Sequence, residues 1–426
     1  MVKTYSIAII GAGPAGTHAA ESARIACPST SIVVISDEQD GFYIREHLNR
    51  FLSGTETEDA LFEKGRGFDA FKSIGVDLVV DTVTRVDLQG HLLHLAGGGS
   101  LGFEQLVIAS GAKPRPLGVP GEHLRGVSTF YSIADARHVI SLLREPGVKQ
   151  VVIIGGGTIA FKISPAILAA GKQLAIIERA PRLLPSLLDT GAATIVSRAT
   201  EARGVRVVLG ANIDRFTGVD GAVTGVDVQG TGIIPAQLVI VAAGVSASIQ
   251  FMKGAPGITL DRGIVVDTSF RANSGGHPPV LAIGDVAQAP DSCHDEQPML
   301  HPSWSFAEES GRHVGSHATG APGLLPTFML MTLEVFDLGI ISAGRIVDRP
   351  GDEVHVRDEG GNVYRKFITC RGKVVGCIMV EPALPRKQAR AWLRAAMSSK
   401  DGLPYDPSLL SRDVKSLVPV RKGDGS

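Results

Sequence analysis

One structural unit occurs twice along this chain, and this duplication restricts the possible folds more than any other feature. The first copy runs from an apolar strand through a glycine turn at 11–16 and a helix to a second strand that ends at Asp37. The second copy has its glycine turn at 155–160 and ends at Glu178. This order of strand, glycine turn, helix, strand and acid predicts two α/β domains of the Rossmann type.

Each glycine turn is predicted to bind the pyrophosphate of a dinucleotide. The first glycine permits the tight turn, the second lets the backbone approach the phosphates, and the third lets helix and strand pack closely. The helix N-terminus supplies amide donors, and the acid can accept hydrogen bonds from a ribose. The predicted binding residues are Gly11, Gly13, Pro14, Ala15, Gly16 and Asp37 in the first copy, and Gly155, Gly157, Thr158, Ile159, Ala160 and Glu178 in the second.

The second copy differs from the usual fingerprint at its third glycine position. Ala160 stands there, an accepted variant that only slightly loosens the packing of helix on strand. Glu178 has no arginine immediately before it, and its carboxylate would repel a 2′-phosphate. This favours NADH over NADPH, although Arg179 and Arg182 lie close enough in the sequence to weaken the preference.

Composition and charge exclude several other classes of protein. The formal net charge of -1 argues against the strongly basic face that nucleic acid requires. No apolar stretch approaches the roughly 20 residues that span a bilayer, and the first apolar run leads into a glycine turn without a cleavage site. The 4 cysteines form no CxxC or zinc pattern. We therefore expect a cytoplasmic protein with reduced thiols and no metal site, and neither a nucleic-acid nor a membrane partner.

Three further motifs resemble those of FAD-dependent pyridine-nucleotide oxidoreductases. The stretch "LVIASGAKPRPLGVPG" (106–121) is similar to the segment that crosses between their domains. Residues 263–287 resemble their second flavin motif, in which an aspartate meets the ribityl chain, and 304–320 resemble the helix that follows. The resemblance covers essentially the whole chain, and it implies as further cofactor-binding residues Arg45, Val83, Ala109, Ser110, Gly111, Gly244, Gly284 and Asp285.

This resemblance also implies a domain organisation. The fold would be α/β, with two Rossmann-like dinucleotide-binding domains, of which the NAD(P)H domain is inserted into the FAD domain, and a C-terminal α+β domain. The FAD-binding domain is expected at 1–120 and 248–325, and the NAD(P)H-binding domain at 121–247. The C-terminal domain is expected at 326–426.

One branch of this superfamily is matched in particular. Disulfide reductases carry a CxxxxC pair, and related oxidases a single cysteine, in a segment that here contains none (40–54). Tyr43, Arg45 and Leu48 are instead similar to the Tyr-x-Arg-x-x-Leu pattern of NADH:rubredoxin reductases and of the flavin part of nitrite reductases. The resemblance implies that FAD takes hydride from NADH, or less readily from NADPH. Electrons would then pass to a rubredoxin- or ferredoxin-like protein, or to a partner oxygenase or reductase.

Two departures from the relatives leave alternatives open. Lys162 stands where relatives usually have glutamate, and Arg50 aligns with a position on the flavin side. Two cations at one flavin face would attract an anionic ligand. Moreover, the Pro-Asn pair that usually follows the glycine at Gly244 is missing. A flavin dehydrogenase or oxidase of a small anionic substrate, with a degenerate NAD site, is therefore an alternative, and so is a flavoprotein kept for binding or regulation.

No catalytic acid or base is assigned from the sequence. Arg50 and Lys162 are candidates for a role near the flavin. The competing interpretation of Lys162 is an ordinary helix residue whose ammonium group extends into solvent.

Overall fold

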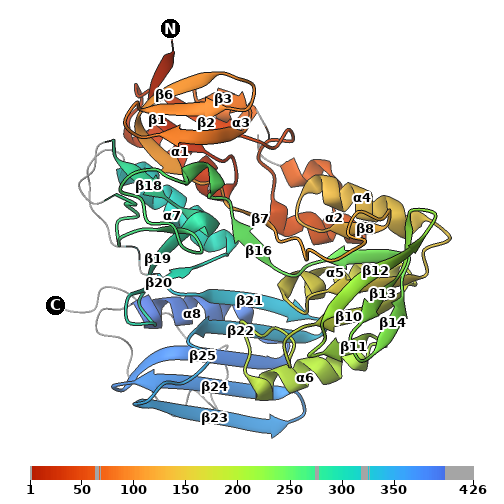
Figure 1. Cartoon of the computed structure of the whole chain (residues 1–426). Helices are drawn as coiled ribbons and strands as arrows, with labels where there is room; N and C mark the ends of the chain where they lie inside the picture. The colour runs from red at the N-terminus through yellow and green to blue at the C-terminus, as the bar shows by residue number, and fades with distance from the viewer. Residues whose placement is uncertain are drawn as a thin grey trace. The chain divides into compact units, whose positions relative to one another are not determined.

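The computed structural model describes residues 2–62, 67, 69–273, 278–317, 325 and 327–398. The chain divides into two compact units (Figure 1). The first unit comprises Met1–His47, Glu56–Lys113 and Val245–Thr327, and the second comprises Leu48–Thr55, Pro114–Gly244 and Phe328–Ser426. The three-domain division inferred from the sequence stays a prediction.

The first unit is built on a seven-stranded sheet in the order β3-β2-β1-β6-β5-β4, with β18 alongside β6. Strands β1, β2, β3, β6 and β18 are parallel, and β4 and β5 extend the sheet in antiparallel fashion. β2 reads as an uninterrupted apolar run up to its last residue because both faces of a parallel sheet are buried. The strands are β1 (Lys3–Ile10), β2 (Ile32–Ser36), β3 (Asp77–Val80), β4 (Val83–Asp87), β5 (Leu92–Leu95), β6 (Ser100–Ile108) and β18 (Val280–Ala282).

The described part of this unit also contains a smaller sheet and three α-helices. The sheet has the order β17-β19-β20. Its strands are β17 (Ile264–Val265), β19 (Ala287–Asp291) and β20 (Gln297–Leu300), and the helices are α1 (Pro14–Ala26), α3 (Asp69–Ser73) and α7 (Trp304–His317). A short two-stranded sheet consists of β7 (Ala112–Pro114) and β16 (Val245–Ala247).

Helices α1 and α7 pack against each other at backbone distance. A Cβ atom at Gly311 would lie 2.3 Å from the carbonyl oxygen of Ala15, and one at Gly315 would lie 2.3 Å from the carbonyl oxygen of Ala19. No side chain fits into these gaps. Glycine at two positions one turn apart therefore lets the helices approach closely.

The second unit contains a five-stranded parallel sheet in the order β11-β10-β9-β15-β8. An antiparallel meander, β12-β13-β14, accompanies it. The strands are β8 (Val127–Thr129), β9 (Gln150–Ile154), β10 (Gln173–Glu178), β11 (Arg206–Leu209), β12 (Ile213–Val219), β13 (Ala222–Val228), β14 (Gly232–Pro235) and β15 (Leu238–Val241). The helices are α2 (Leu48–Ser53), α4 (Ile133–Arg144), α5 (Thr158–Ala169) and α6 (Thr190–Glu201).

The same unit ends in a five-stranded antiparallel sheet with the order β21-β22-β25-β24-β23. The amphipathic helix α8 (Arg386–Ser398) buries Trp392 against Phe367 of this sheet, with the ring centroids 6.4 Å apart. The elements are β21 (Leu330–Val335), β22 (Leu338–Gly344), β23 (Asp352–Gly360), β24 (Val363–Cys370), β25 (Lys373–Pro382) and α8 (Arg386–Ser398).

Asp189 joins this antiparallel sheet to the Rossmann-like part of the unit. One carboxylate oxygen caps α6 by accepting the amide of Ala192 at 3.1 Å. The other oxygen accepts the Tyr364 hydroxyl at 2.7 Å and lies 3.1 Å from the ammonium of Lys366. A single acid therefore begins a helix and anchors a strand.

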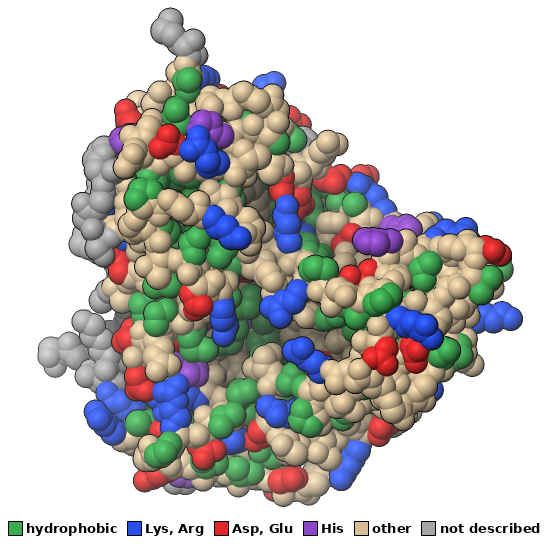
Figure 2. Space-filling view, viewed as in Figure 1, with side chains coloured by type: hydrophobic (Ala, Val, Ile, Leu, Met, Phe, Trp, Pro, Cys, Tyr) green, Lys and Arg blue, Asp and Glu red, His purple; other side chains and the backbone are tan. Residues whose placement is uncertain are grey.

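The architecture confirms the predicted fold class, an α/β protein with two Rossmann-like sheets and a β-rich C-terminal part. No helix in the described part of the chain is long and apolar enough to cross a membrane. Acidic and basic side chains are interspersed over the face drawn in Figure 2, in keeping with the net charge of -1.

Replacement of Gly311 by alanine tests the packing of α1 on α7. The added methyl group would collide with the Ala15 carbonyl, so we expect the free energy of unfolding to fall by about 1–3 kcal/mol. Gly147→Ala is the matched control, because a Cβ atom at Gly147 meets nothing within 4 Å. Urea denaturation measures both changes, and equal stability of the Gly311→Ala variant and the wild-type protein would contradict the prediction.

Candidate dinucleotide-binding sites

The first glycine turn connects β1 to α1 and tolerates no side chain at two of its glycines. Gly11 has a φ of +110°, and a Cβ atom there would lie 2.2 Å from the carbonyl oxygen of Ala109. A Cβ atom at Gly16 would lie 1.9 Å from the carbonyl oxygen of Gly11. The turn therefore requires glycine at both positions.

Gly13 has the opposite environment. It is the N-cap of α1, no side chain caps the helix there, and a Cβ atom at Gly13 would meet nothing within 4 Å. Among the described residues, no side chain therefore covers the backbone at the start of α1, where the helix dipole is positive. This arrangement fits the pyrophosphate of a dinucleotide, because a phosphate can approach the backbone without steric hindrance.

The second turn repeats this geometry between β9 and α5. Gly155 has a φ of +106°, and its Cβ atom would lie 2.4 Å from the carbonyl oxygen of Ala242. Gly157 is the N-cap of α5, again without a side-chain cap and with open space around its Cβ position. The methyl group of Ala160 is fully buried, whereas Gly16 in the first copy has no room for a methyl group. The second turn therefore fits a pyrophosphate as well.

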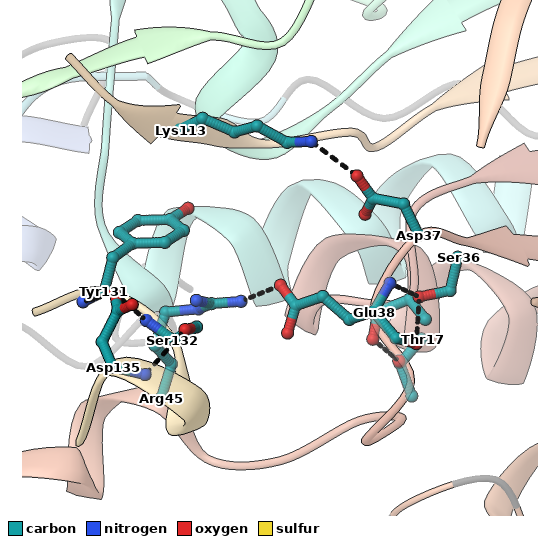
Figure 3. A network of polar contacts seen from close by, with 10 residues as sticks. Thr17, Ser36, Asp37, Glu38, Arg45, Lys113, Tyr131, Ser132 and Asp135 are labelled. Carbon is teal, nitrogen blue, oxygen red and sulfur yellow. Dashed lines mark hydrogen bonds and ion pairs between the residues drawn. The ribbon is translucent and has the colours of Figure 1, made fainter. Parts of the chain in front are cut away.

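The acids after β2 form two ion pairs, which are visible in Figure 3. The carboxylate of Asp37 lies 2.6 Å from the ammonium of Lys113, and the carboxylate of Glu38 lies 2.6 Å from the guanidinium of Arg45. Asp37 and Arg45 are among the residues predicted from the sequence, whereas Glu38 and Lys113 are not. Two adjacent acids give no local signal of which one faces a ligand.

Glu178, at the end of β10, stabilises the second glycine turn. Its carboxylate accepts the amide of Gly156 at 2.6 Å and the amide of Ala180 at 2.7 Å. The guanidinium of Arg182 donates instead to two carbonyls of its own loop, those of Leu188 at 2.9 Å and Pro185 at 3.1 Å. Arg182 is thus held by the loop that follows Glu178.

Gly284 and Asp285 lie where three segments of the first unit meet. The amide of Gly284 donates to the hydroxyl of Ser310 on α7 at 3.1 Å, and a Cβ atom at Gly284 would lie 2.9 Å from the Cβ of Ala15 on α1. Although part of Asp285 stays exposed, burial of its carboxyl group raises its pKa to about 6, and the positive charge of Arg45 acts in the opposite direction. A buried carboxyl group with a shifted pKa, such as that of Asp285, is typical of a ligand site.

The remaining predicted residues fall into both units. In the first unit Val83 and Ala109 are buried. The Ser110 hydroxyl donates to the carbonyl of Ser248 at 2.8 Å, and the Gly111 carbonyl accepts the Ser248 amide at 2.9 Å. In the second unit Gly244 has a φ of +94°. Their binding roles stay predictions.

Arg50 and Lys162 lie on neighbouring helices of the second unit. Arg50 is on α2 and exposed, Lys162 is on α5 and partly buried, and α2 packs against α5. Their proposed attraction for an anionic ligand stays a hypothesis. Over the described ranges, no group of three or more His, Cys, Asp or Glu side chains could hold a metal ion.

Comparison with known proteins identifies two matching families along the chain. The family described as pyridine nucleotide-disulphide oxidoreductase matches residues 5–303, and the rubredoxin NAD+ reductase C-terminal domain matches residues 330–399. A probable ferredoxin reductase of Castellaniella defragrans is 29% identical over 405 residues, which cover 94% of this chain and 96% of that protein. A rubredoxin-NAD(+) reductase of Pseudomonas putida is 30% identical over 67% of this chain and 72% of that protein.

A solved structure shows the same fold. A ferredoxin reductase from Rhodopseudomonas palustris superposes with a TM-score of 0.83 at 25% sequence identity. The match covers 97% of this chain and 99% of that protein. The similarity therefore extends over both compact units.

Asp285→Asn tests the environment of the Gly284–Asp285 turn. A raised pKa means that the folded state keeps a proton that the unfolded state has already lost. Binding of this proton by Asp285 stabilises the folded state. The stabilisation is complete below about pH 4 and is lost as the pH rises through about 6. Between pH 4 and 7.5, flavin-free wild-type protein should therefore lose about 2 kcal/mol more of its free energy of unfolding than the Asn variant.

Urea denaturation of the flavin-free proteins at several pH values measures this difference. Asp220→Asn, at an exposed site outside this turn, is the control that separates the loss of any acid from the loss of this one. If Asp285→Asn and wild-type protein showed the same pH dependence, the carboxyl group would be well solvated.

Proposed function

This chain belongs to the pyridine nucleotide-disulphide oxidoreductase family, and from this premise we propose that it is an FAD-dependent reductase that takes hydride from NADH. Electrons then pass to a small iron protein of the rubredoxin or ferredoxin type, or to a partner oxygenase or reductase. The family membership and the oxidoreductase class predicted from the sequence are confirmed.

One observation carries the proposal. Both glycine turns keep an open glycine at the N-terminus of a helix, Gly13 at α1 and Gly157 at α5. A relay from a nicotinamide nucleotide to a flavin needs two dinucleotide sites, whereas a flavoprotein that oxidises a small anionic substrate needs only one. The open glycine at the second turn therefore supports the relay over the single-site alternative.

The first unit would hold FAD. The residues proposed for it are Gly11, Gly13, Pro14, Ala15, Gly16, Asp37, Arg45, Val83, Ala109, Ser110, Gly111, Gly284 and Asp285. When bound, FAD accepts a two-electron hydride and can release electrons singly. The backbone at Gly13 would bind the pyrophosphate, and Asp285 would bind the ribityl hydroxyls.

The second unit would hold the nicotinamide nucleotide. The residues proposed for it are Gly155, Gly157, Thr158, Ile159, Ala160, Glu178 and Gly244. We also propose the division into an FAD-binding domain (1–120 and 248–325), an NAD(P)H-binding domain (121–247) and a C-terminal domain (326–426).

NADH is the proposed donor rather than NADPH. Glu178 places a carboxylate at the end of β10, where a 2′-phosphate would meet negative charge. Of the two arginines that could offset this charge, Arg182 donates to the carbonyls of Leu188 and Pro185. An arginine that already satisfies two carbonyls is a poor partner for an added phosphate.

The proposed acceptor rests on the relatives and on the C-terminal domain. The relatives described above are named as reductases of ferredoxin or rubredoxin, and the C-terminal family match carries the rubredoxin reductase name. These names favour electron transfer to an iron protein over oxidation of a small anionic substrate.

Anaerobic stopped-flow mixing with NADH and with NADPH tests the proposal. We expect NADH to bleach the visible flavin absorbance, at a rate at least about tenfold higher than NADPH, because Glu178 opposes the 2′-phosphate. Oxidised rubredoxin or ferredoxin should then restore the absorbance. If neither nucleotide bleached the flavin while dithionite did, the proposal would fail and the interpretation based on Arg50 and Lys162 would take its place.

Glu178→Gln tests the donor preference. The amide keeps the size of the side chain and removes its charge, while its NH2 group replaces one of the two oxygens that accept the amides of Gly156 and Ala180. Because the charge is lost, we expect the ratio of kcat/KM for NADH to that for NADPH to fall about tenfold. Glu201→Gln, an exposed acid at the end of α6, is the matched control and should leave this ratio unchanged. An unaltered ratio in the Glu178→Gln variant would assign the preference to other residues.

A further inference from the structure

Strand β23 forms one edge of the C-terminal antiparallel sheet. Within the part of the chain that the structure describes, this nine-residue strand pairs with β24 alone. Two of its valines are unusually exposed for apolar residues, Val354 at 42% and Val356 at 48%. Long edge strands with exposed apolar side chains are ready to pair with another strand, and proteins usually protect them.

The sequence of β23 is complementary to itself. When the strand "DEVHVRD" (352–358) is placed antiparallel to a second copy with the two His355 residues opposite each other, Glu353 faces Arg357 of that copy. In the same register Val354 faces Val356 of the second copy. Both pairs occur twice because of the two-fold symmetry.

These pairs separate onto the two faces of the sheet. Side chains alternate along a strand, so Glu353, His355 and Arg357 share one face and the two valines share the other. The ladder with β24 bears this out, since the His355 ring lies 3.3 Å from the Thr369 hydroxyl on its own face. One face of the junction would therefore hold opposite charges, and the other face four valines.

We propose that a second copy of this chain pairs edge to edge with β23, so that the two C-terminal sheets become one continuous sheet. A two-fold interface must be complementary to itself, and this strand meets that condition in charge and in apolar contact. Main-chain hydrogen bonds between the two β23 strands would further stabilise the interface, in addition to the charge pairs and the valine contacts.

Two features of the strand bear on this pairing. Asp352 would face Asp358 of the second copy, but the side chain of Asp352 is buried and already forms an ion pair with Arg345, 2.8 Å away. Arg357 forms an ion pair with Glu359 of its own strand, where Glu359 is about half exposed. Exposed ion pairs of this kind stabilise a protein little, so Arg357 can exchange its partner at low cost.

Reversal of charges tests the register of the proposed dimer. Glu353→Arg would place two arginines opposite each other in each of the two symmetric pairs, and Arg357→Glu would place two glutamates there. We expect each single variant to weaken the dimer at least about tenfold. The double variant restores opposite charges in the same register and should recover the wild-type dissociation constant.

Sedimentation velocity and light scattering, at protein concentrations from about 1 to 100 μM, measure the oligomeric state of the flavin-loaded chain. The wild-type chain should dimerise with increasing concentration, and Val356→Lys should stay monomeric. Glu201→Arg, a reversal of charge at an exposed site outside β23, is the control and should dimerise like the wild type. Far-UV circular dichroism and flavin content establish that each variant is folded.

Two outcomes would overturn the proposal. A wild-type chain that stays monomeric at every concentration would rule out a second copy as the occupant of β23. A dimer that tolerates both single reversals would place the contact elsewhere. A dimer weakened by each reversal and recovered in the double variant supports the register centred on His355.

Discussion

Backbone contact at Ala15 is the constraint on which the first unit depends. Two glycines contact this residue: Gly284 lies against the Ala15 methyl and Gly311 against the Ala15 carbonyl. The next residue in the chain, Gly16, lies against the carbonyl of Gly11. Gly16 and Gly311 have no space for a methyl group, and Gly284 has almost none. The glycine turn, the Gly284–Asp285 turn and α7 are therefore positioned by the same few atoms, and the proposed pyrophosphate and ribityl sites inherit their geometry from one packing point.

The second unit is assembled by different means. Its third turn position, Ala160, carries a buried methyl group, so contact between helix and strand is looser than in the first copy. Polar groups link its Rossmann-like part to its C-terminal sheet. Asp189 begins α6 and accepts hydrogen-bond donors from β24, and the Ser342 hydroxyl of β22 donates to the carbonyl of Leu187 at 2.7 Å. The loop after Glu178 is thus hydrogen-bonded to the C-terminal sheet. The position of the sheet would therefore affect the binding of a ligand at that loop.

Much of the fold could be predicted from the sequence, because the glycine turns and apolar strands are local patterns. The carboxylate partners could not, since they depend on residues far apart in the chain: Lys113 reaches Asp37 across 76 positions. Nor could the location of α2 be predicted. Residues Leu48–Thr55 group with the second compact unit because α2 packs on α5, a tertiary contact that no periodicity encodes.

Glu178 stabilises the second glycine turn and would still have acceptor capacity for a ligand. Its carboxylate accepts two amides, from Gly156 and Ala180, and so holds the turn in shape. An ionised carboxylate has about four acceptor sites, so two remain for the hydroxyls of an adenosine ribose. The ribose would therefore bind without breaking the contacts that hold the turn, and little reorganisation would oppose binding. A 2′-phosphate offers no donor to these two sites and adds negative charge beside them, and this is the physical reason to expect NADH at the second turn.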